Sequence, residues 1–225
     1  MPADIAEKLM MAMVLAAGRG ERLMPITASV PKALVEVRGR SLLERHLRAL
    51  ASAGIETVVI NLGWFGDRII EKIGSGAAYG LNVIYSPEGD NILETGGGIH
   101  RALPMLGSDP FLVVNADIYS DMPLPLEDLQ AQCVGHLVLV PKPDYRPTGD
   151  FGLLDGRVRN VSNPELTFSG VAVYRPEFFV DCTPGRFSLV PMLRAAADAG
   201  TLSGSVYSGR WQDVGTPERL AELNA

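Results

Sequence analysis

The chain has 225 residues, of which 47% are hydrophobic and 20% charged, and its formal net charge at pH 7 is -6. An acidic balance argues against a nucleic-acid binder, which presents a basic face. The two cysteines, Cys133 and Cys182, lack the spacing of a zinc site or a disulfide framework. No apolar run reaches the roughly 20 residues of a membrane-spanning helix, so we expect a cytoplasmic protein that makes no membrane contact.

Residues 1–10 contain Asp4, Glu7 and Lys8 and have no secretory pattern, so we expect a flexible leader before a single domain from 11 to 225. In the first part of this domain, about 11–120, strands are predicted at 11–17, 57–61, 81–85 and 111–115. Helices are predicted after a capping box at Ser41 and Glu44, and at 65–73 and 95–103. This alternation predicts a mostly parallel, Rossmann-like α/β sheet flanked by helices, with ligands beyond the carboxyl ends of its strands.

The part from about 121 to 225 has a different pattern. Short strands are predicted at 136–140, 151–154, 158–161, 167–174 and 203–207, with helices at 189–199 and 217–223. Turn residues separate these strands, which is typical of an antiparallel or mixed arrangement. We therefore expect a small extension of the sheet that carries a second substrate pocket.

The first predicted strand breaks into Gly18 and Gly20, and the cations Arg19, Arg22 and Lys32 follow. Backbone N–H groups in a glycine-rich turn can hold phosphate oxygens, and nearby cations add positive charge. Taken alone, a Gly-x-Gly is more often an ordinary strand-to-helix turn. It is not a dinucleotide fingerprint, because Leu23 stands where that motif has its third glycine. The chain also has no Gly-x-x-x-x-Gly-Lys P-loop.

The same stretch resembles the signature of the sugar-1-phosphate nucleotidylyltransferases. The matching residues are Leu15, Ala16, Ala17, Gly18, Gly20, Arg22, Leu23, Pro25, Thr27, Pro31 and Lys32. The resemblance implies the nucleotide-diphospho-sugar transferase fold. It also implies a reaction that depends on Mg²⁺, in which a nucleoside triphosphate and a sugar 1-phosphate give a nucleotide sugar and pyrophosphate.

The resemblance also implies roles for single residues. Lys32 would contact the α-phosphate and Arg22 the leaving pyrophosphate, while Asp117 and Asp213 would hold the metal ion. The plain alternative for each aspartate is a strand-end residue that caps a turn. The residues expected to bind the nucleotide are Leu15, Ala16, Ala17, Gly18, Arg19, Gly20, Glu94, Thr95, Gly96, Gly97 and Asn115. The three glycines 96–98 would leave room for a flat base at the start of a helix.

The expected sugar-phosphate pocket is formed by Asp150, Asn163, Glu165, Ser169 and Gly170. Asn163 stands where the family often has a lysine, so the usual cation on the acceptor phosphate is missing. Arg194 and Lys142 are the alternative cations. For His46 we expect packing rather than catalysis.

Three segments resemble relatives that use UTP and N-acetylmuramic acid 1-phosphate in cell-wall recycling: Leu93–Ile99, Thr167–Val171 and Asp213–Leu220. UTP and that sugar are therefore the expected partners, with the protein as a monomer or a homodimer. Mannose 1-phosphate with GTP, glucose 1-phosphate with TTP or UTP, and a phospho-alcohol acceptor remain alternatives. A non-catalytic nucleotide-binding regulatory domain is the alternative from another class.

Overall fold

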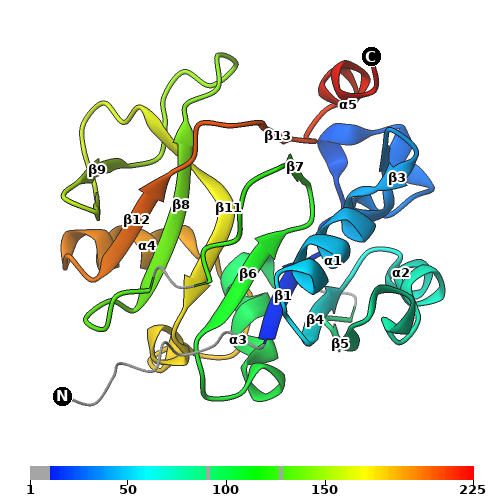
Figure 1. Cartoon of the computed structure of the whole chain (residues 1–225), viewed down its shortest axis with the longest axis horizontal. Helices are drawn as coiled ribbons and strands as arrows, with labels where there is room; N and C mark the ends of the chain where they lie inside the picture. The colour runs from blue at the N-terminus through cyan, green and yellow to red at the C-terminus, as the bar shows by residue number, and fades with distance from the viewer. Residues whose placement is uncertain (1–10, 90–91, 127–128) are drawn as a thin grey trace.

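The computed structural model describes residues 11–89, 92–126 and 129–225, so the expected leader, residues 1–10, lies outside the described residues. A nine-stranded mixed sheet runs through the molecule in the order β5-β4-β1-β6-β11-β8-β12-β10-β9 (Figure 1). In the described ranges, no helix has the length and apolar character that crossing a membrane requires. The predicted α/β class is confirmed.

Four parallel strands form one half of the sheet: β1 (Met11–Leu15), β4 (Thr57–Leu62), β5 (Asn82–Pro87) and β6 (Phe111–Asn115). Their side chains alternate between two hydrophobic cores, with Ala12 and Val14 on one face and Met13 on the other. The first strand ends at Leu15, two residues before the predicted end. It stops there because the backbone N–H of Ala16 donates to the side chain of Asn61 at 2.6 Å instead of continuing the ladder.

The remaining strands continue the same sheet. Strand β11 (Leu166–Tyr174) is antiparallel to both β6 and β8 (Gly135–Pro141), and β12 (Leu202–Val206) lies parallel to β8. Two short antiparallel strands, β10 (Arg157–Arg159) and β9 (Gly152–Leu154), complete the edge. The predicted change to mixed pairing is confirmed, and it gives one continuous sheet rather than a separate layer.

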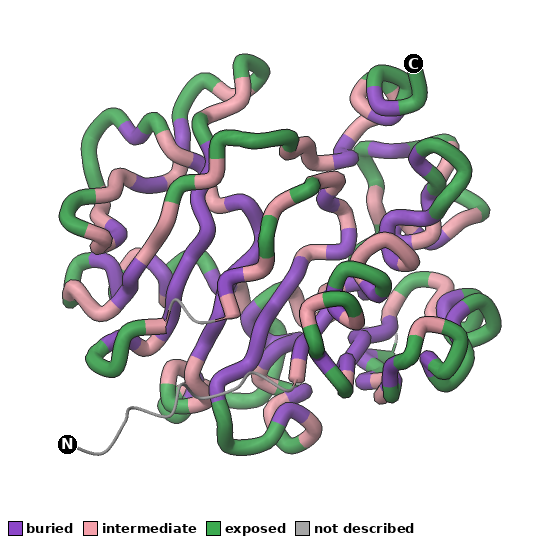
Figure 2. Tube along the Cα trace, viewed as in Figure 1, coloured by how far each residue is buried: buried purple, intermediate pink, exposed green. Residues whose placement is uncertain are grey.

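Helices cover both faces of the sheet, and the strands between them are mostly buried (Figure 2). Helices α1 (Leu42–Ser52) and α2 (Gly66–Ile73) pack into one core, and α3 (Glu94–Leu106) and α4 (Val190–Asp198) pack into the other. The predicted capping box is present at the start of α1, where the Ser41 hydroxyl and the Glu44 backbone N–H are joined at 3.3 Å.

A small ribbon that was not predicted joins the two halves of the chain. Strand β7 (Ile118–Ser120) pairs antiparallel with β13 (Trp211–Asp213), and α5 (Pro217–Asn224) follows. A third core cluster, which includes Leu23, Val37, Val214 and Leu220, packs the glycine-rich loop and the hairpin of β2 (Glu36–Val37) and β3 (Arg40–Ser41) against α5. The ribbon therefore brings the C-terminal segment beside the loop that follows β1.

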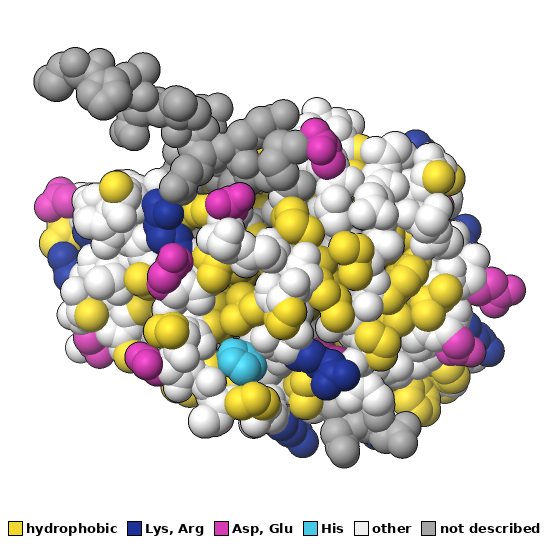
Figure 3. All heavy atoms as spheres, turned by 90° about the horizontal axis from the view of Figure 1, so that it is seen from below, with side chains coloured by type: hydrophobic (Ala, Val, Ile, Leu, Met, Phe, Trp, Pro, Cys, Tyr) yellow, Lys and Arg dark blue, Asp and Glu magenta, His cyan; other side chains and the backbone are white. Residues whose placement is uncertain are grey.

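The face seen from below in Figure 3 shows hydrophobic side chains interspersed with polar atoms and a few charged groups. Such mixing is ordinary for a folded surface. The ribbon lies at the opposite end of the molecule, where Figure 1 shows the tips of β7 and β13.

Candidate active site

Two adjoining pockets lie at the carboxyl ends of the parallel strands. A cleft of about 1190 Å³ is lined by the loop that follows β1 and by the start of α3. A second pocket, of about 380 Å³, is lined by β11, β13 and residues 145–146. Arg22, Asn115 and Asp117 line both. A ligand in the cleft and one in the second pocket would therefore meet at these three residues.

The glycine-rich loop forms one wall of the cleft, and its lining residues are Leu15, Ala16, Ala17, Gly18, Arg19, Gly20, Glu21, Arg22 and Lys32. Gly20 has a φ of 66°, and a β-carbon there would lie 2.9 Å from Cγ2 of Thr27, so only glycine fits. Gly18 has no atom within 4 Å of the β-carbon position, so its backbone is open to a ligand. Among the described residues, the Arg22 guanidinium has no hydrogen-bond or ion-pair partner.

A buried polar bracket holds this loop against α3. Asn61 accepts the Ala16 N–H at 2.6 Å and donates to Glu88 Oε1 at 2.7 Å. The other Glu88 oxygen accepts the Leu93 N–H at 2.7 Å, just before α3. Sequence reasoning did not select Asn61 or Glu88, although a polar residue at the end of an apolar strand is a usable signal.

Helix α3 begins at Glu94, one residue before the predicted start, and the three glycines lie in its N-terminal part as expected. Glu94 and Thr95 line the cleft, whereas Gly96 and Gly97 do not. A β-carbon at Gly96 would lie 2.5 Å from the ring of Phe187, and one at Gly97 would overlap the carbonyl of Gly185. The Gly97 N–H donates to the Phe187 carbonyl at 3.1 Å. The glycines thus make room for residues 185–187, which close this side of the cleft.

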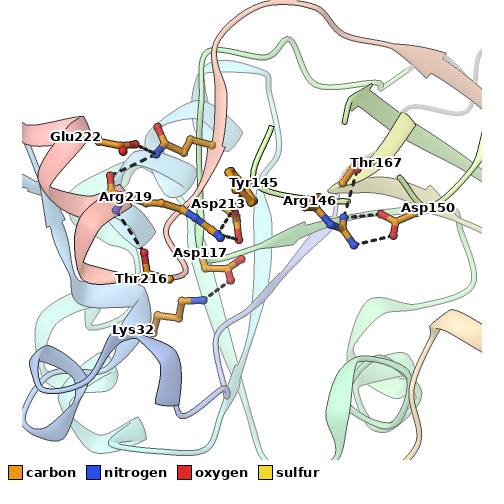
Figure 4. Close-up of polar contacts among 11 residues, drawn as sticks. Lys32, Asp117, Tyr145, Arg146, Asp150, Thr167, Asp213, Thr216, Arg219 and Glu222 are labelled. Carbon is orange, nitrogen blue, oxygen red and sulfur yellow. Dashed lines mark hydrogen bonds and ion pairs between the residues drawn. The ribbon is translucent and has the colours of Figure 1, made fainter. Parts of the chain in front are cut away.

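The two predicted metal ligands come together through the ribbon. Asp117 lies in the turn between β6 and β7, and Asp213 is the last residue of β13 and pairs with Ile118. The Val214 N–H donates to the Asp117 carbonyl at 2.7 Å. Both aspartates line the second pocket. Lys32 forms an ion pair with Asp117, and these side chains are 14% and 28% exposed (Figure 4).

Asp213 is held by Tyr145 and by Arg219, and sequence reasoning did not select Arg219. Arg219 Nη1 donates to its two oxygens at 2.8 and 2.7 Å, and the Tyr145 hydroxyl donates to Oδ1 (Figure 4). The Arg219 guanidinium also stacks on the Tyr145 ring, with its carbon 3.6 Å from the ring centroid. Burial, together with the hydrogen bond to Asp213, raises the pKa of Tyr145, so its hydroxyl stays a donor.

The remaining sugar-pocket predictions divide into two groups. Ser169 lines the second pocket, and Asp150 lies just behind it, where it binds Arg146 at 2.9 and 3.0 Å. Gly170 has a φ of 82° and packs against Asn115 instead of lining the pocket. Asn163 and Glu165 are exposed and line neither pocket.

Neither alternative cation reaches the second pocket. Arg194 stacks on Phe151, with its guanidinium carbon 4.5 Å from the ring centroid, and Lys142 lies near the Arg146 carbonyl at 3.5 Å. The arginines that do line it are Arg22, Arg146 and Arg219. Arg219 could have been found from the sequence, because it follows the Asp-Val-Gly-Thr-Pro motif by two residues. Arg146 lies in a loop without any such signal.

The donor set suits a magnesium ion held jointly by protein and substrate. Mg²⁺ typically takes one or two carboxylates and fills its shell with phosphates and water. Asp117 and Asp213 supply two carboxylates to one pocket. No group of three or more histidine, cysteine, aspartate or glutamate side chains placed to enclose a metal ion occurs within 11–89, 92–126 and 129–225. This arrangement fits a metal that arrives with phosphates better than a metal in a cage made by protein alone.

Comparison with known proteins places this geometry in a family. A profile described as MobA-like NTP transferase domain matches residues 12–148. The chain is 46% identical to the N-acetylmuramate alpha-1-phosphate uridylyltransferase of Neisseria meningitidis serogroup B, over 96% of this chain and 97% of the relative. It is 36% identical to the enzyme of the same name from Caulobacter vibrioides, over 94% and 97%.

Solved structures show the same fold at low identity. HddC from Yersinia pseudotuberculosis superposes with a TM-score of 0.79 at 21% identity, covering 96% of this chain and 98% of its own. UDP-glucose pyrophosphorylase complexed with UDP-glucose superposes with a TM-score of 0.77 at 19% identity, covering 96% and 97%. The chain therefore belongs to the MobA-like NTP transferase domain family and, within it, to the sugar-1-phosphate nucleotidylyltransferases, which transfer nucleotides to sugar 1-phosphates.

Proposed function

We propose that the enzyme transfers UMP from UTP to N-acetylmuramic acid 1-phosphate and releases pyrophosphate. The observation that carries this proposal is the identity of 46% over nearly the whole length of a relative named for that acceptor and a uridylyl group. The two pockets that share Arg22, Asn115 and Asp117 support it, because two substrates must meet for the transfer.

The nucleotide would occupy the larger cleft, with its phosphates at the glycine-rich loop. Gly18 leaves open backbone there, and Arg19, Arg22 and Lys32 add positive charge. The base would lie toward Glu94 and Thr95 at the start of α3. Arg186 donates to Glu94 at 2.8 Å, which fixes the direction of that carboxylate.

The chemistry needs positioning and charge more than proton transfer. The attacking oxygen of the sugar phosphate is already ionised, so a strong general base is not required. The difficulty is that two anions must approach each other while negative charge builds on the leaving pyrophosphate. Lys32, which lines the larger cleft and pairs with Asp117, would stabilise the α-phosphate. Arg22, which has no partner among the described residues, would bind the departing phosphates.

Members of the family generally depend on a divalent metal ion. Here Asp117 and Asp213 would hold Mg²⁺, which would supply positive charge to the phosphate oxygens. The ribbon of β7 and β13 fixes the two carboxylates relative to each other, so their side chains need little rearrangement. Lys32 and Arg219 form ion pairs with these two carboxylates and hold them in position.

The acidic lactyl group of the acceptor needs a cation, and Arg146 is the candidate. Its Nη1 and Nη2 donate to Asp150, and Nη1 also donates to Thr167 at 3.3 Å. These contacts leave the Nε–H and one Nη2 hydrogen as a parallel pair, the arrangement that binds a carboxylate through two hydrogen bonds. Arg146 lines the second pocket, where the sugar would lie.

A pyrophosphate-release assay tests the proposal. N-acetylmuramic acid 1-phosphate and Mg²⁺ would be supplied with UTP, TTP, GTP, CTP or ATP in turn. We expect release with UTP and little with the other nucleotides. Release only with mannose 1-phosphate and GTP, or with glucose 1-phosphate and TTP, would replace the proposed substrate pair. N-acetylglucosamine 1-phosphate lacks the lactyl group, so Arg146→Gln should reduce the preference for the acidic sugar over it.

A further inference from the structure

Arg219 presents a pre-oriented pair of N–H donors in the second pocket. Only its Nη1 is used by Asp213, while Nε and Nη2 donate to no other described residue. The stack on Tyr145 fixes the plane of the guanidinium, and the side chain is 16% exposed. A guanidinium with a free Nε and Nη2 edge matches two oxygens of a phosphate.

The position of Arg219 also suits a phosphate. A β-carbon at Gly215 would lie 2.9 Å from Arg219 Nη1, 3.0 Å from Asp213 Oδ2 and 3.5 Å from Arg22 Nη2. The guanidinium groups of Arg219 and Arg22 and the carboxylate of Asp213 thus lie close together beside Gly215, which has no side chain. Because Arg22 also lines the cleft, this point lies where the second pocket opens toward the nucleotide. The phosphate of an acceptor sugar must reach that opening to attack.

The segment around Asn163, in which the family often has a lysine for the acceptor phosphate, lies outside the second pocket. Asn163 stands at the position of that lysine, is exposed and lines neither pocket. Arg194 and Lys142 line neither pocket either. Of the three arginines in the second pocket, Arg146 is occupied by Asp150 on its Nη1 and Nη2 edge and lies on the sugar side. Arg219 alone among them is anchored on the proposed metal ligand Asp213.

We propose that Arg219 binds the phosphate of the acceptor sugar 1-phosphate through its Nε and Nη2 edge. In this role Arg219 takes the place of the lysine that the family often has at the position of Asn163. Tyr145 acts as a positioning residue that holds the guanidinium plane. The inference rests on a sugar 1-phosphate as the acceptor, and it does not depend on which sugar or nucleotide is used.

Steady-state kinetics of Arg219→Gln test this proposal, with inorganic phosphate as a competitive inhibitor against the acceptor. Loss of a charged, two-point contact should raise both the KM for the sugar 1-phosphate and the Ki for inorganic phosphate about 10- to 100-fold. The KM for the nucleotide should stay unchanged, and the half-saturating Mg²⁺ concentration should rise by a smaller factor than the acceptor KM and the phosphate Ki, because Arg219 also holds Asp213. Arg219→Lys retains the charge without the fork, so its values should fall between those of the wild type and Arg219→Gln.

Arg48→Gln is the matched control, because Arg48 also stacks on a tyrosine, Tyr79, with its guanidinium carbon 5.6 Å from the ring centroid, and lines neither pocket. An unchanged acceptor KM in folded Arg219→Gln would overturn the proposal. A raised half-saturating Mg²⁺ concentration with an unchanged Ki for phosphate would also overturn it, since Arg219 would then act only through Asp213. If thermal melts show that Arg219→Gln is unfolded, the proposal is tested with Arg219→Lys instead. The acceptor KM and the Ki for inorganic phosphate are then compared between Arg219→Lys and the wild type.

N-acetylmuramic acid 1-phosphate is the first acceptor to use. If the wild type is inactive with it and active with another sugar 1-phosphate, the proposed acceptor is wrong. The Arg219 variants are then compared with the active acceptor, because the phosphate is common to both. The two proposals can therefore fail separately.

Discussion

The three cations in and beside the junction of the two pockets differ in how they are paired. Lys32 pairs with Asp117 and Arg219 with Asp213, while Arg22 has no partner among the described residues. The two pairs hold carboxylates and cations in place before a substrate arrives, so little reorganisation is needed when the phosphates bind. In the proposed reaction, Arg22 would bind the leaving pyrophosphate, on which negative charge develops.

Replacing one of the proposed metal ligands should affect turnover more than folding. We expect Asp117→Asn to lower kcat about 10²- to 10³-fold, because the neutral amide neither holds a divalent ion well nor pairs with Lys32. The initial rate at saturating UTP and acceptor measures this effect. Asp121→Asn is the control, because Asp121 accepts a hydrogen bond from Tyr207 and lines neither pocket. Wild-type turnover in Asp117→Asn would refute the metal role.

Gly18 offers a test of the loop that leaves the fold intact. No atom lies within 4 Å of its β-carbon position and its φ is not in the left-handed region, so Gly18→Ala should unfold at the wild-type temperature. If phosphates approach the backbone here, the added methyl group should raise the KM for the nucleotide and leave that for the acceptor unchanged. An unchanged nucleotide KM would place the phosphates away from Gly18.

At the scale of elements, local patterns predicted some features well and others poorly. The parallel strands and the α1 cap were predictable, because alternation of apolar residues and a Ser-x-x-Glu box are encoded within a few residues. The ribbon of β7 and β13 was not, because each strand has three residues and its partner lies some ninety positions away. Arg219 and Tyr145 likewise meet only through tertiary packing.

The glycine triplet shows why a correct motif can be misread. Glycine disfavours helices, and the sequence predicts that the three glycines at the start of this helix make room for a base. In the structure the close approach of residues 185–187 and Glu88 requires positions without side chains, and packing outweighs the intrinsic preference. Asn163 and Glu165 were assigned to the sugar pocket by position in a motif, and that loop lies on the exposed surface.

The cap of α1 has a pH dependence that can be measured. Burial alone would raise the pKa of Glu44, but hydrogen bonds from Ser41 outweigh it and lower that pKa below its usual 4.5. The stabilisation is therefore present above pH 4.5 and is lost as the pH falls through the folded-state pKa. Ser41→Ala should lower the free energy of unfolding at pH 7 by about 1 kcal/mol.

Urea unfolding of the wild type and Ser41→Ala at pH 7 and below pH 4 measures this dependence. The difference between them should narrow at the lower pH, where Glu44 is protonated. Ser52→Ala, at the exposed end of the same helix, is the control and should not change the free energy of unfolding. If the difference in free energy of unfolding between the wild type and Ser41→Ala stayed constant with pH, Glu44 would not be the source of the pH dependence.

At the scale of the whole molecule, α1 also packs behind the reaction centre. Its His46 lies against the backbone of Ala116 and Ile118, and burial lowers the pKa of His46 to about 4, although Asp117 acts in the opposite direction. The expectation that His46 packs rather than reacts agrees with its Nε2, which is buried without a hydrogen-bond partner among the described residues.

This histidine should make the whole fold less stable in mild acid. The unfolded chain takes up a proton near pH 6.5 and the folded chain only near pH 4, so the free energy of unfolding falls as the pH drops through this window. The loss is at most about 3 kcal/mol. Urea unfolding at pH 7 and pH 4.5 should show a smaller drop for His46→Gln than for the wild type. If the free energy of unfolding fell equally with pH in the wild type and in His46→Gln, His46 would not be the source of the acid sensitivity.

The backbone hydrogen bond from Val214 to Asp117 has a consequence for how activity arises during synthesis. The cleft that would take the nucleotide is lined by residues up to 117 except for Gly185, Arg186 and Gly215, whereas Asp213 arrives almost a hundred residues later. Most of the residues that line this cleft are thus translated long before both carboxylates are present. If both aspartates hold the metal ion as proposed, transfer must wait until the late ribbon strand has been translated and has paired with β7.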